Sequence, residues 1–362
     1  MPLTHSDYMD RALFHAARGR GRTSPNPLVG AVVVSQDGIV VGQGFHERAG
    51  DAHAEVRALD AAGPRARAGT LYCTLEPCAH HGRTGPCAVR IVEAGIARVV
   101  AAVEDPNPLV SGQGFAYLQN HGVAVEVGLG ETLATRLNQP FFTLIRERRP
   151  FVILKAAVST DGCIAEAPGH RTQLTSAAAE RHAHRVRAEV DAIGVGVGTI
   201  IVDDPVLTAR GAFRVRPLTR VVFDRNLRTP LRSRLLSTGD AGPVIIVTTD
   251  SGASREDVRR QLTSDGAEIL VAPDPTLRAA LGCLAARGIS SLLLEGGAIV
   301  HQAAWDEGLA DFVQLYVTPH TLGAAGLRFL NGLPFVPTVL SEVRVETLAP
   351  DVLIEGYVHR PR

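Results

Sequence analysis

The sequence feature that most constrains this chain is a set of metal-ligand residues in its first quarter. His53 is followed two residues later by Glu55, and two cysteines, Cys78 and Cys87, each come directly after a proline. One imidazole and two thiolates suit zinc, and three protein ligands leave a position for water, as in catalytic rather than structural zinc sites. Glu55 is close enough to the expected ligand His53 to carry protons to and from that water. The pattern therefore predicts a catalytic zinc site.

Helices and strands are expected to alternate around these residues. His53 and Glu55 would lie at the start of one helix, Cys78 would follow a strand, and Cys87 would open the next helix. The partial positive charge at a helix N-terminus favours thiolate over thiol and so favours metal binding. Strands separated by helices in this way predict a layered α/β domain. The expected elements are helices at 51–61 and 88–94 and strands at 70–75 and 98–103.

A structural zinc site is the main alternative. It would need a fourth protein ligand, which His80 or His81 could supply, whereas Cys73 lies within an expected strand and is more typical of a core residue. The neighbouring glutamate favours the catalytic interpretation, and the H-E-x-x-H pattern of zinc peptidases is absent. Replacement of an exocyclic amine by oxygen on a heterocycle is the reaction that such a set suits. The glycine-containing loop 79–85 must bulge beside the metal, and we expect its Arg83 to hold an anionic group of the substrate.

Charge and composition argue against several classes of partner. The 37 basic and 37 acidic residues balance, so no bulk field favours nucleic acid or an anionic membrane. The longest apolar runs, such as 289–294, have the length of a strand and not of a membrane span. Residues 1–10 are polar and lack an apolar signal segment, and five cysteines in 362 residues do not suggest a disulfide framework. We therefore expect a cytoplasmic protein.

A second domain is expected after a charged run that ends at Pro150. The sequence predicts domains at 1–147 and 148–362, the second opening with a buried strand at 151–158. Lys155 within that strand is either a snorkelling edge residue or a functional cation.

Glycines in the second half give only weak motifs. Gly194, Gly196 and Gly198 alternate with aliphatic residues, but their spacing is not that of a dinucleotide fingerprint, and close approach of neighbouring strands explains them about as well. A buried strand runs into Glu295-Gly296-Gly297 and then a helix, which predicts either a phosphate-binding corner or an ordinary tight turn. The pair Asp203-Asp204 is expected in a loop.

Motifs in the first half resemble the deaminase half of the bifunctional riboflavin-biosynthesis deaminase/reductase family. The wide spacing of the two cysteines, which departs from nucleic-acid and cytidine deaminases, is typical of that family. The resemblance implies a cytidine-deaminase-like α/β/α fold with Asn26 near the substrate. The motifs are PNPLVG at 25–30, HAE at 53–55, TLEPCAHHGRTGPC at 74–87 and DPNP at 105–108.

Three motifs in the second half resemble the reductase half of the same family: KAAVSTDG at 155–162, DDPVLT at 203–208 and LEGG at 294–297. The resemblance implies a dihydrofolate-reductase-like α/β fold that uses NADPH. Two arginines at a substrate site make physical sense if a phosphate must be held. The implied cofactor residues are Ala157, Thr199, Asp203, Gly297, Ala298, Ile299, Val300, His301, Gln302 and Ala303, and the implied substrate residues are Arg187, Leu207, Arg210 and Glu295.

Two residues depart from the family pattern. Gln173 stands where the family commonly has tryptophan, and Arg225 stands where it often has serine. Arg225 could contact the 2′-phosphate of the cofactor, but we expect it to face solvent.

The function implied by the resemblance has two steps. A zinc site would deaminate 2,5-diamino-6-(5-phosphoribosylamino)pyrimidin-4-one, and NADPH would then reduce the ribosyl group of the product to ribityl. Asp203 is the candidate for proton handling in the reductase, with Lys155 as electrostatic support. A homo-oligomer, dimer or tetramer, is expected. The alternatives are a nucleic-acid deaminase, a binding module with a structural zinc, and a deaminase whose reductase half is degenerate, which Gln173 makes the most serious.

Overall fold

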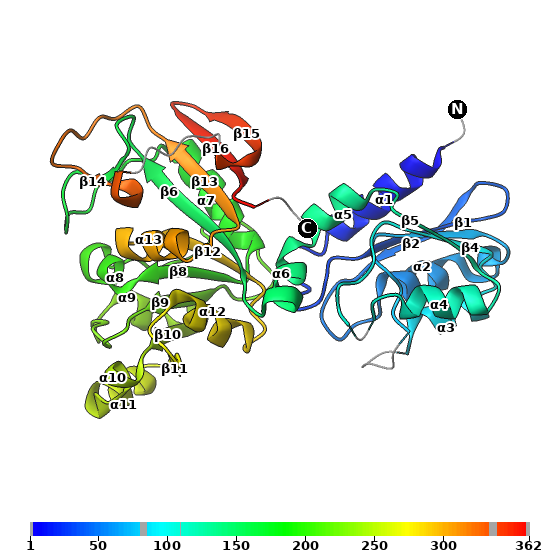
Figure 1. Cartoon of the computed structure of the whole chain (residues 1–362), viewed down its shortest axis with the longest axis horizontal. Coiled ribbons are helices and arrows are strands. Elements are labelled where there is room, and N and C mark those ends of the chain that lie inside the picture. The colour runs from blue at the N-terminus through cyan, green and yellow to red at the C-terminus, as the bar shows by residue number, and fades with distance from the viewer. Residues whose placement is uncertain (1–2, 80–84, 109, 333–338, 360–362) are drawn as a thin grey trace. The chain divides into compact units, whose positions relative to one another are not determined.

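The computed structural model describes residues 3–79, 85–108, 110–332 and 339–359. The chain forms two compact units, residues 1–147 and residues 148–360, and the order of their elements can be followed in Figure 1. Each unit has its own sheet and its own hydrophobic clusters.

The first unit contains a five-stranded sheet in the order β2-β1-β3-β4-β5. Strand β1 is antiparallel to β2 and β3, whereas β3, β4 and β5 run parallel. The strands are β1 (Gly30–Val34), β2 (Val40–Phe45), β3 (Thr70–Cys73), β4 (Arg98–Ala101) and β5 (Ala124–Val127), and the helices are α1 (His5–Ala17), α2 (Ala54–Ala62), η1 (Gly63–Ala66), α3 (Cys87–Glu93), α4 (Gln113–Asn120), α5 (Glu131–Leu137) and α6 (Gln139–Glu147).

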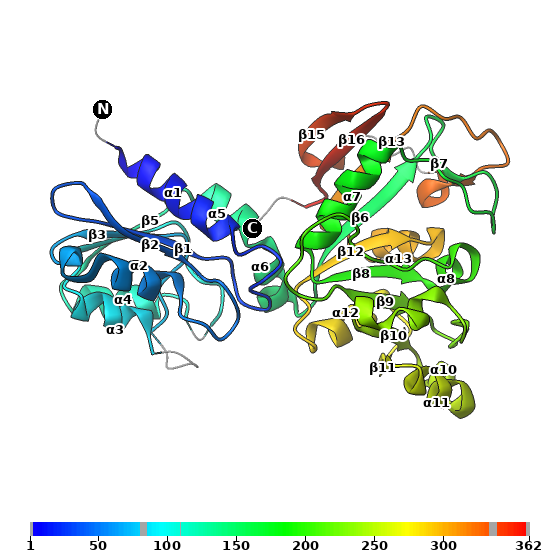
Figure 2. The same ribbon diagram turned by 180° about the vertical axis from the view of Figure 1, so that it is seen from behind.

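Helices cover both faces of this sheet. One cluster packs α2, α3 and α4 against the strands through side chains such as Leu59, Ile91 and Leu118. A second cluster packs α1 and α5 against the opposite face through Met9 and Ala134. Figure 2 shows the two groups of helices on either side of the strands. The predicted α/β/α layering is therefore confirmed.

The second unit contains a nine-stranded sheet in the order β11-β10-β9-β8-β12-β6-β13-β16-β15. The first seven strands in this order, from β11 across to β13, run parallel to their neighbours. Strand β16 is antiparallel to β13, and β15 is antiparallel to β16. Its strands are β6 (Phe151–Val158), β8 (Ala192–Gly196), β9 (Thr219–Phe223), β10 (Val244–Thr248), β11 (Ala267–Val271), β12 (Ser291–Gly296), β13 (Phe312–Val317), β15 (Ser341–Leu348) and β16 (Asp351–Tyr357), and a separate pair is formed by β7 (Cys163–Ala165) and β14 (Leu327–Arg328).

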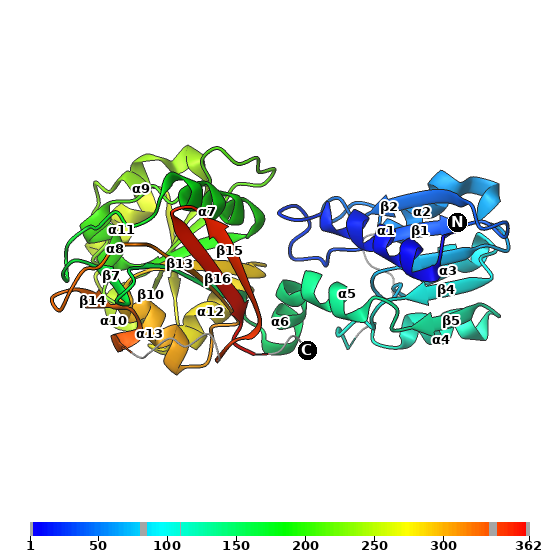
Figure 3. The ribbon, with the colours of Figure 1, turned by 90° about the horizontal axis from the view of Figure 1, so that it is seen from above.

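Helices also cover both faces of the larger sheet. Helices α12 and α13 belong to one cluster, with Leu281 and Ala304, and α8, α9 and α11 belong to another, with Ile200 and Leu262. Figure 3 shows α7 beside β16. Ala179 of α7 belongs to a buried cluster with Tyr316 of β13 and Leu353 of β16. The helices are α7 (Ala177–Glu189), α8 (Val197–Asp203), α9 (Arg234–Ser237), η2 (Gly239–Ala241), α10 (Asp250–Ala253), α11 (Glu256–Ser264), α12 (Leu277–Ala285), α13 (Ala298–Asp306) and η3 (Phe329–Gly332).

Two boundaries near the expected sites differ from the sequence prediction. The helix expected from residue 51 begins at Ala54, so His53 occupies the N-cap position with an extended backbone. Asp203, expected in a loop, is the last residue of α8, and Asp204 ends that helix with φ +41°. In both cases the residue lies beside a helix end, which local propensity locates least well.

Gly30 allows helix α1 to lie directly on strand β1. A Cβ atom at this position would come within 2.0 Å of the backbone oxygen of Ala12 and 2.6 Å of the nitrogen of Ala16. We therefore expect Gly30→Ala to lower the free energy of unfolding by about 2–4 kcal/mol, because backbone must move to relieve the overlap. Chemical denaturation measures this, and Gly85→Ala is the control, since among the residues that the structure describes a Cβ there meets nothing within 4 Å. Equal stability of the two variants would contradict the close approach.

Candidate active sites

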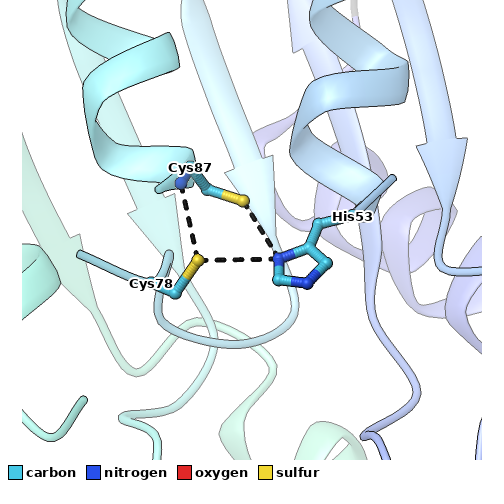
Figure 4. A group of neighbouring side chains, drawn as sticks. All are labelled: His53, Cys78 and Cys87. Atoms are coloured by element: carbon cyan, nitrogen blue, oxygen red, sulfur yellow. Dashed lines mark hydrogen bonds between the residues drawn. The ribbon is translucent and has the colours of Figure 1, made fainter. Parts of the chain in front are cut away.

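The three predicted zinc ligands converge at the ends of three elements (Figure 4). His53 caps α2, Cys78 follows β3, and Cys87 is the first residue of α3. His53 Nδ1 lies 3.2 Å from Cys87 Sγ and 3.6 Å from Cys78 Sγ, and the backbone N–H of Cys87 donates to Cys78 Sγ at 3.4 Å. Their ligand atoms all lie within 4.8 Å of one another.

This arrangement fits a zinc ion. Zinc–sulfur and zinc–nitrogen bonds of about 2.3 and 2.1 Å at tetrahedral angles place nitrogen and sulfur roughly 3.6 Å apart, close to the distances from His53. The pKa of Cys78 is lowered to about 4 by its hydrogen bonds with Cys87 and His53, so this sulfur is a thiolate that a cation can bind. His80 and His81, which could complete a structural site, lie outside the described residues.

Glu55 lies in the first turn of α2, beside the ligands. Its side chain is buried, and burial raises the pKa of Glu55 to about 7, although His53 opposes this. Its Oε2 atom is buried and has no hydrogen-bond partner in the described part of the chain. A buried carboxyl oxygen without a partner costs free energy, so it fits a group placed between Glu55 and the three ligands. A carboxyl group that titrates near neutral pH can both accept and return a proton.

The site opens into a cavity of about 430 Å³ that also contains the predicted substrate residue Asn26. Asn26 Nδ2 lies 3.1 Å from His46 Nε2, and His46 Nδ1 lies 3.4 Å from the backbone oxygen of Ala52. His46 also lines the cavity and contacts His53 edge-on, with ring centroids 5.4 Å apart. The sequence analysis missed His46, because this residue lies in none of the motifs that resemble the deaminase family. The predicted substrate residue Arg83 lies outside the described residues.

Glu76 is a second residue that sequence reasoning missed. Its buried carboxylate accepts backbone N–H groups from Asp105 and Gly112 at Oε2 (3.3 and 3.1 Å) and from Gly114 and Phe115 at Oε1 (2.9 and 3.3 Å). It thereby ties the 105–115 segment, part of which lines the cavity, to the turn that carries Cys78. The sequence shows that Glu76 belongs to the motif around Cys78, but only the folded chain brings the four backbone N–H donors to its carboxylate.

The second unit contains a larger cavity, of about 880 Å³, at the carboxyl ends of its parallel strands. Ligands bind at such ends in open parallel α/β sheets. Nearly all the residues implied for the cofactor and the substrate line it, namely Lys155, Ala157, Arg187, Thr199, Asp203, Leu207, Arg210, Glu295, Gly297, Ala298, Ile299, Val300, His301 and Ala303.

Gln302 is not among the lining residues. Its side chain donates to Asp306 Oδ1 at 2.7 Å, along helix α13. The departures Gln173 and Arg225 both line the cavity. Gln173 donates to Glu180 Oε1 at 2.7 Å, and Arg225 is exposed on the segment after β9.

Glu295 forms ion pairs with two basic residues of this cavity, Arg187 and Lys155. Arg187 donates from Nε and Nη2 to its two carboxylate oxygens, both at 2.6 Å, and Lys155 Nζ lies 4.0 Å from Oε2. Burial raises the pKa of Glu295, but Arg187 and Lys155 outweigh it and lower the value to about 2. Lys155 also lies over the ring of Tyr316, 5.2 Å from its centroid, and burial lowers the pKa of Lys155. Among the described residues, the ion-pair partner of Lys155 is Glu295. Asp203, the other residue predicted to take part in catalysis here, has its pKa raised by burial.

The turn after β12 brings together residues that are distant in sequence. Gly297 has φ +87°, and a Cβ on Gly296 would come within 3.1 Å of Thr199 Oγ1 on α8. Behind the turn, His301 is fully buried and its Nε2 lies 3.1 Å from the backbone oxygen of Leu294. His301 thus links the first turn of α13 to the end of β12.

Comparisons with known proteins cover both units. Residues 2–103 match the cytidine and deoxycytidylate deaminase zinc-binding region, and residues 150–354 match the RibD C-terminal domain. The chain thus combines a zinc-binding deaminase region with a reductase domain. Riboflavin biosynthesis protein RibD of Aquifex aeolicus is 41% identical over 96% of this chain and 97% of its own length, and that of Bacillus amyloliquefaciens is 42% identical over 95% and 94%.

Solved structures agree. RibD of Acinetobacter baumannii superposes with a TM-score of 0.87 at 36% identity, and the diaminohydroxyphosphoribosylaminopyrimidine deaminase/5-amino-6-(5-phosphoribosylamino)uracil reductase of Thermotoga maritima with 0.83 at 34%, each over 97% of this chain and 98% of that one. The chain belongs to the RibD family of riboflavin biosynthesis proteins. It is a bifunctional enzyme with a zinc-dependent deaminase domain and an NADPH-dependent reductase domain. The family and fold expected from the motifs are confirmed. No helix in the described ranges is long and apolar enough to cross a membrane.

Replacing Glu76 tests its role in tying the 105–115 segment. Glu76→Gln puts an N–H group against backbone donors, so at least one buried hydrogen bond is lost. We expect the free energy of unfolding to fall by about 2–4 kcal/mol. The control is Glu104→Gln, because that carboxylate directly before the segment is exposed and accepts the Ser111 hydroxyl rather than buried backbone donors. A similar, small effect of both substitutions in chemical denaturation would contradict the prediction.

His301 should make stability depend on pH. Burial lowers the pKa of His301 to about 4, from 6.5 in the unfolded chain. The unfolded state therefore takes up a proton first, so the contribution is complete above pH 6.5 and is lost as the pH falls toward 4, by on the order of 3 kcal/mol. His301→Gln keeps an N–H donor but does not titrate, so its unfolding free energy should vary less between pH 7 and 4. The exposed His320→Gln is the control, and parallel pH profiles for wild type and His301→Gln would refute the assignment.

Proposed function

We propose that the first domain hydrolytically deaminates 2,5-diamino-6-(5-phosphoribosylamino)pyrimidin-4-one. The second domain then uses NADPH to reduce the ribosyl group of 5-amino-6-(5-phosphoribosylamino)uracil to ribityl. The observation that carries the proposal is the convergence of His53, Cys78 and Cys87 beside the unpartnered carboxyl oxygen of Glu55. The name of the Thermotoga maritima relative supports the choice of substrates.

In the deaminase site, His53, Cys78 and Cys87 would hold zinc, which when bound activates water for attack on the amine-bearing carbon. Glu55 accepts a proton from the attacking water and returns it to the ring nitrogen and the departing amine. Asn26, which lines the same cavity, orients the heterocycle. Arg83 is assigned to the anionic end of the substrate.

In the reductase site, NADPH supplies hydride to C1′ of the ribose, and the protein supplies binding and orientation. Ala157, Thr199, Asp203 and the 297–303 turn are assigned to the cofactor. Arg187 and Arg210 hold the substrate phosphate, with Leu207 and Glu295 at the same site, and Glu295 also fixes the guanidinium of Arg187 through two hydrogen bonds. Asp203 handles the proton at the sugar oxygen, with Lys155 as electrostatic support.

A degenerate reductase is not favoured over this function. The relatives match over nearly the whole chain, and Gln173 lines the cavity where the family commonly has tryptophan without closing it. The balanced charge favours a small-molecule substrate over nucleic acid. A cytoplasmic homo-oligomer, dimer or tetramer, completes the proposal, and light scattering of the purified chain tests the oligomeric state.

The deaminase step is tested with Glu55→Gln. We expect ammonia release from the diaminopyrimidine phosphate to fall by roughly 10²–10⁴-fold, because the amide cannot carry protons. Zinc content by elemental analysis should stay near one per chain, as it should in the exposed control Glu93→Gln, which should also keep full activity. Loss of zinc in Glu55→Gln would instead make Glu55 a metal ligand.

The reductase step is measured in the same samples by NADPH absorbance. Wild-type protein and Glu55→Gln should both oxidise NADPH when given the deaminated intermediate, since that step uses the second cavity. Normal ammonia release with no NADPH oxidation would support the degenerate reductase instead.

A further inference from the structure

His184 lies between the two arginines that are assigned to the substrate phosphate. It is on helix α7, one turn before Arg187. Its Nδ1 accepts the backbone N–H of Arg210 at 3.1 Å and lies 3.4 Å from Arg187 Nη1. Arg210 Nε donates toward Nε2 of His184 at 3.4 Å, and Arg210 Nη2 lies 3.4 Å from the same atom. Both ring nitrogens therefore face N–H donors.

A neutral imidazole cannot accept at both nitrogens, because one of them carries a hydrogen. The shorter contact, from the backbone N–H of Arg210, assigns Nδ1 of His184 as the acceptor. Nε2 then carries the hydrogen and faces the guanidinium of Arg210. In the opposite tautomer, the hydrogen on Nδ1 of His184 would point at the hydrogen on the backbone nitrogen of Arg210, and these two nitrogens are only 3.1 Å apart. In this tautomer the Nε2–H of His184 and the N–H groups of Arg210 face one another across 3.4 Å, with no acceptor between them in the described part of the chain other than the ring itself.

The groups around the ring keep it neutral. Burial lowers the pKa of His184, and Arg187 and Arg210 lower it further, while Glu295 and the backbone oxygen of Thr208 act in the opposite direction. The carboxylate of Glu295 accepts two hydrogen bonds from Arg187, and the oxygen of Thr208 accepts from Arg187 Nη1 at 3.0 Å. Both of these groups thus already accept hydrogen bonds from Arg187.

An anion would satisfy the converging donors. His184, Arg187 and Arg210 all line the 880 Å³ cavity, next to Thr208 and Leu207. A phosphate oxygen between His184 Nε2 and Arg210 would accept from both, and hydrogen bonds to a charged group are about twice as strong as those between neutral groups. Phosphate has oxygens to spare for such a donor set, whereas an uncharged hydroxyl does not.

We propose that His184 is a substrate-binding residue of the reductase, which donates from Nε2 to the phosphate group in the tautomer that the Arg210 backbone imposes. The proposal rests on the function proposed above and adds a residue to it. It also gives the site a neutral donor beside two cations, so that recognition of the phosphate depends on hydrogen-bond geometry as well as on charge.

Two substitutions separate the donor from the acceptor. His184→Asn keeps an oxygen near the position of Nδ1, which can accept the Arg210 N–H, but it has no group at the position of Nε2. His184→Gln carries an N–H donor that reaches the position of Nε2. Arg185→Gln is the control, because Arg185 is exposed on the same helix and does not line the cavity.

The readouts are steady-state kinetics of NADPH oxidation and calorimetric binding of ribose 5-phosphate without cofactor. We expect His184→Asn to raise KM for 5-amino-6-(5-phosphoribosylamino)uracil, and Kd for ribose 5-phosphate, by about 10–100-fold, as for a lost hydrogen bond to a charged group. The kcat should change little, because the phosphate is remote from C1′. His184→Gln should restore both constants to within about threefold of wild type. With the substrate lacking its 5′-phosphate, all four proteins should behave alike.

The outcomes distinguish the two proposals. If wild type neither binds nor reduces the phosphorylated substrate, the proposed function fails. If wild type turns over normally and His184→Asn retains its KM and Kd, or loses affinity equally for the substrate without phosphate, the role of His184 is wrong. Nitrogen-15 NMR of the imidazole gives a check that needs no variant. It should show the Nε2–H tautomer and a shift of that resonance on addition of ribose 5-phosphate, and the Nδ1–H tautomer would overturn the proposal.

Discussion

Both sites depend on the need to compensate carboxylates that are buried in the protein. An unpaired buried charge costs several kcal/mol, so its partners fix the geometry around it. Glu295 is compensated by two hydrogen bonds from Arg187 and by Lys155, which places two cations in the reductase cavity. Glu76 is compensated by four backbone N–H groups, which hold a segment beside the deaminase cavity. Glu55 is the exception, because one of its oxygens has no partner among the described residues and its pKa is raised to about 7.

This contrast separates supporting residues from the residue that we propose moves protons. Glu76 and Glu295 are fully engaged, so they are suited to holding other groups in position. Glu55 is not, and a buried carboxyl group with a pKa near neutrality can exchange protons at little cost. The three side chains have the same chemistry, and their surroundings give them different roles.

The two domains place their sites by the same topological rule. In each, a chain segment leaves the carboxyl end of a parallel strand and meets the first turn of a helix. After β3 this brings Cys78 to the start of α3, and at the end of β12 it brings Glu295 and Gly297 to the start of α13. Helix N-termini carry partial positive charge, which suits thiolates in the first case and an anionic group in the second. Local departures such as Gln173 leave this framework intact, because that side chain lies at the cavity and bonds to Glu180.

The sequence by itself determined the two α/β folds and the family, and it predicted three zinc ligands that the folded chain brings together, because ligand types, their spacing and the strand and helix patterns are local properties of the chain. It also indicated Glu55, which is two residues from a predicted ligand. It did not indicate Glu76, His46 or His184, since each has a partner in a more distant segment: Glu76 is bonded to residues 29 to 39 positions away, His46 to Asn26, and His184 to Arg210. The end of α8 at Asp203 was also missed, because helix ends depend on packing as well as on propensity. Only the tertiary structure brings these donors and acceptors together, and the cost of leaving a buried polar group unpaired then decides what each side chain does.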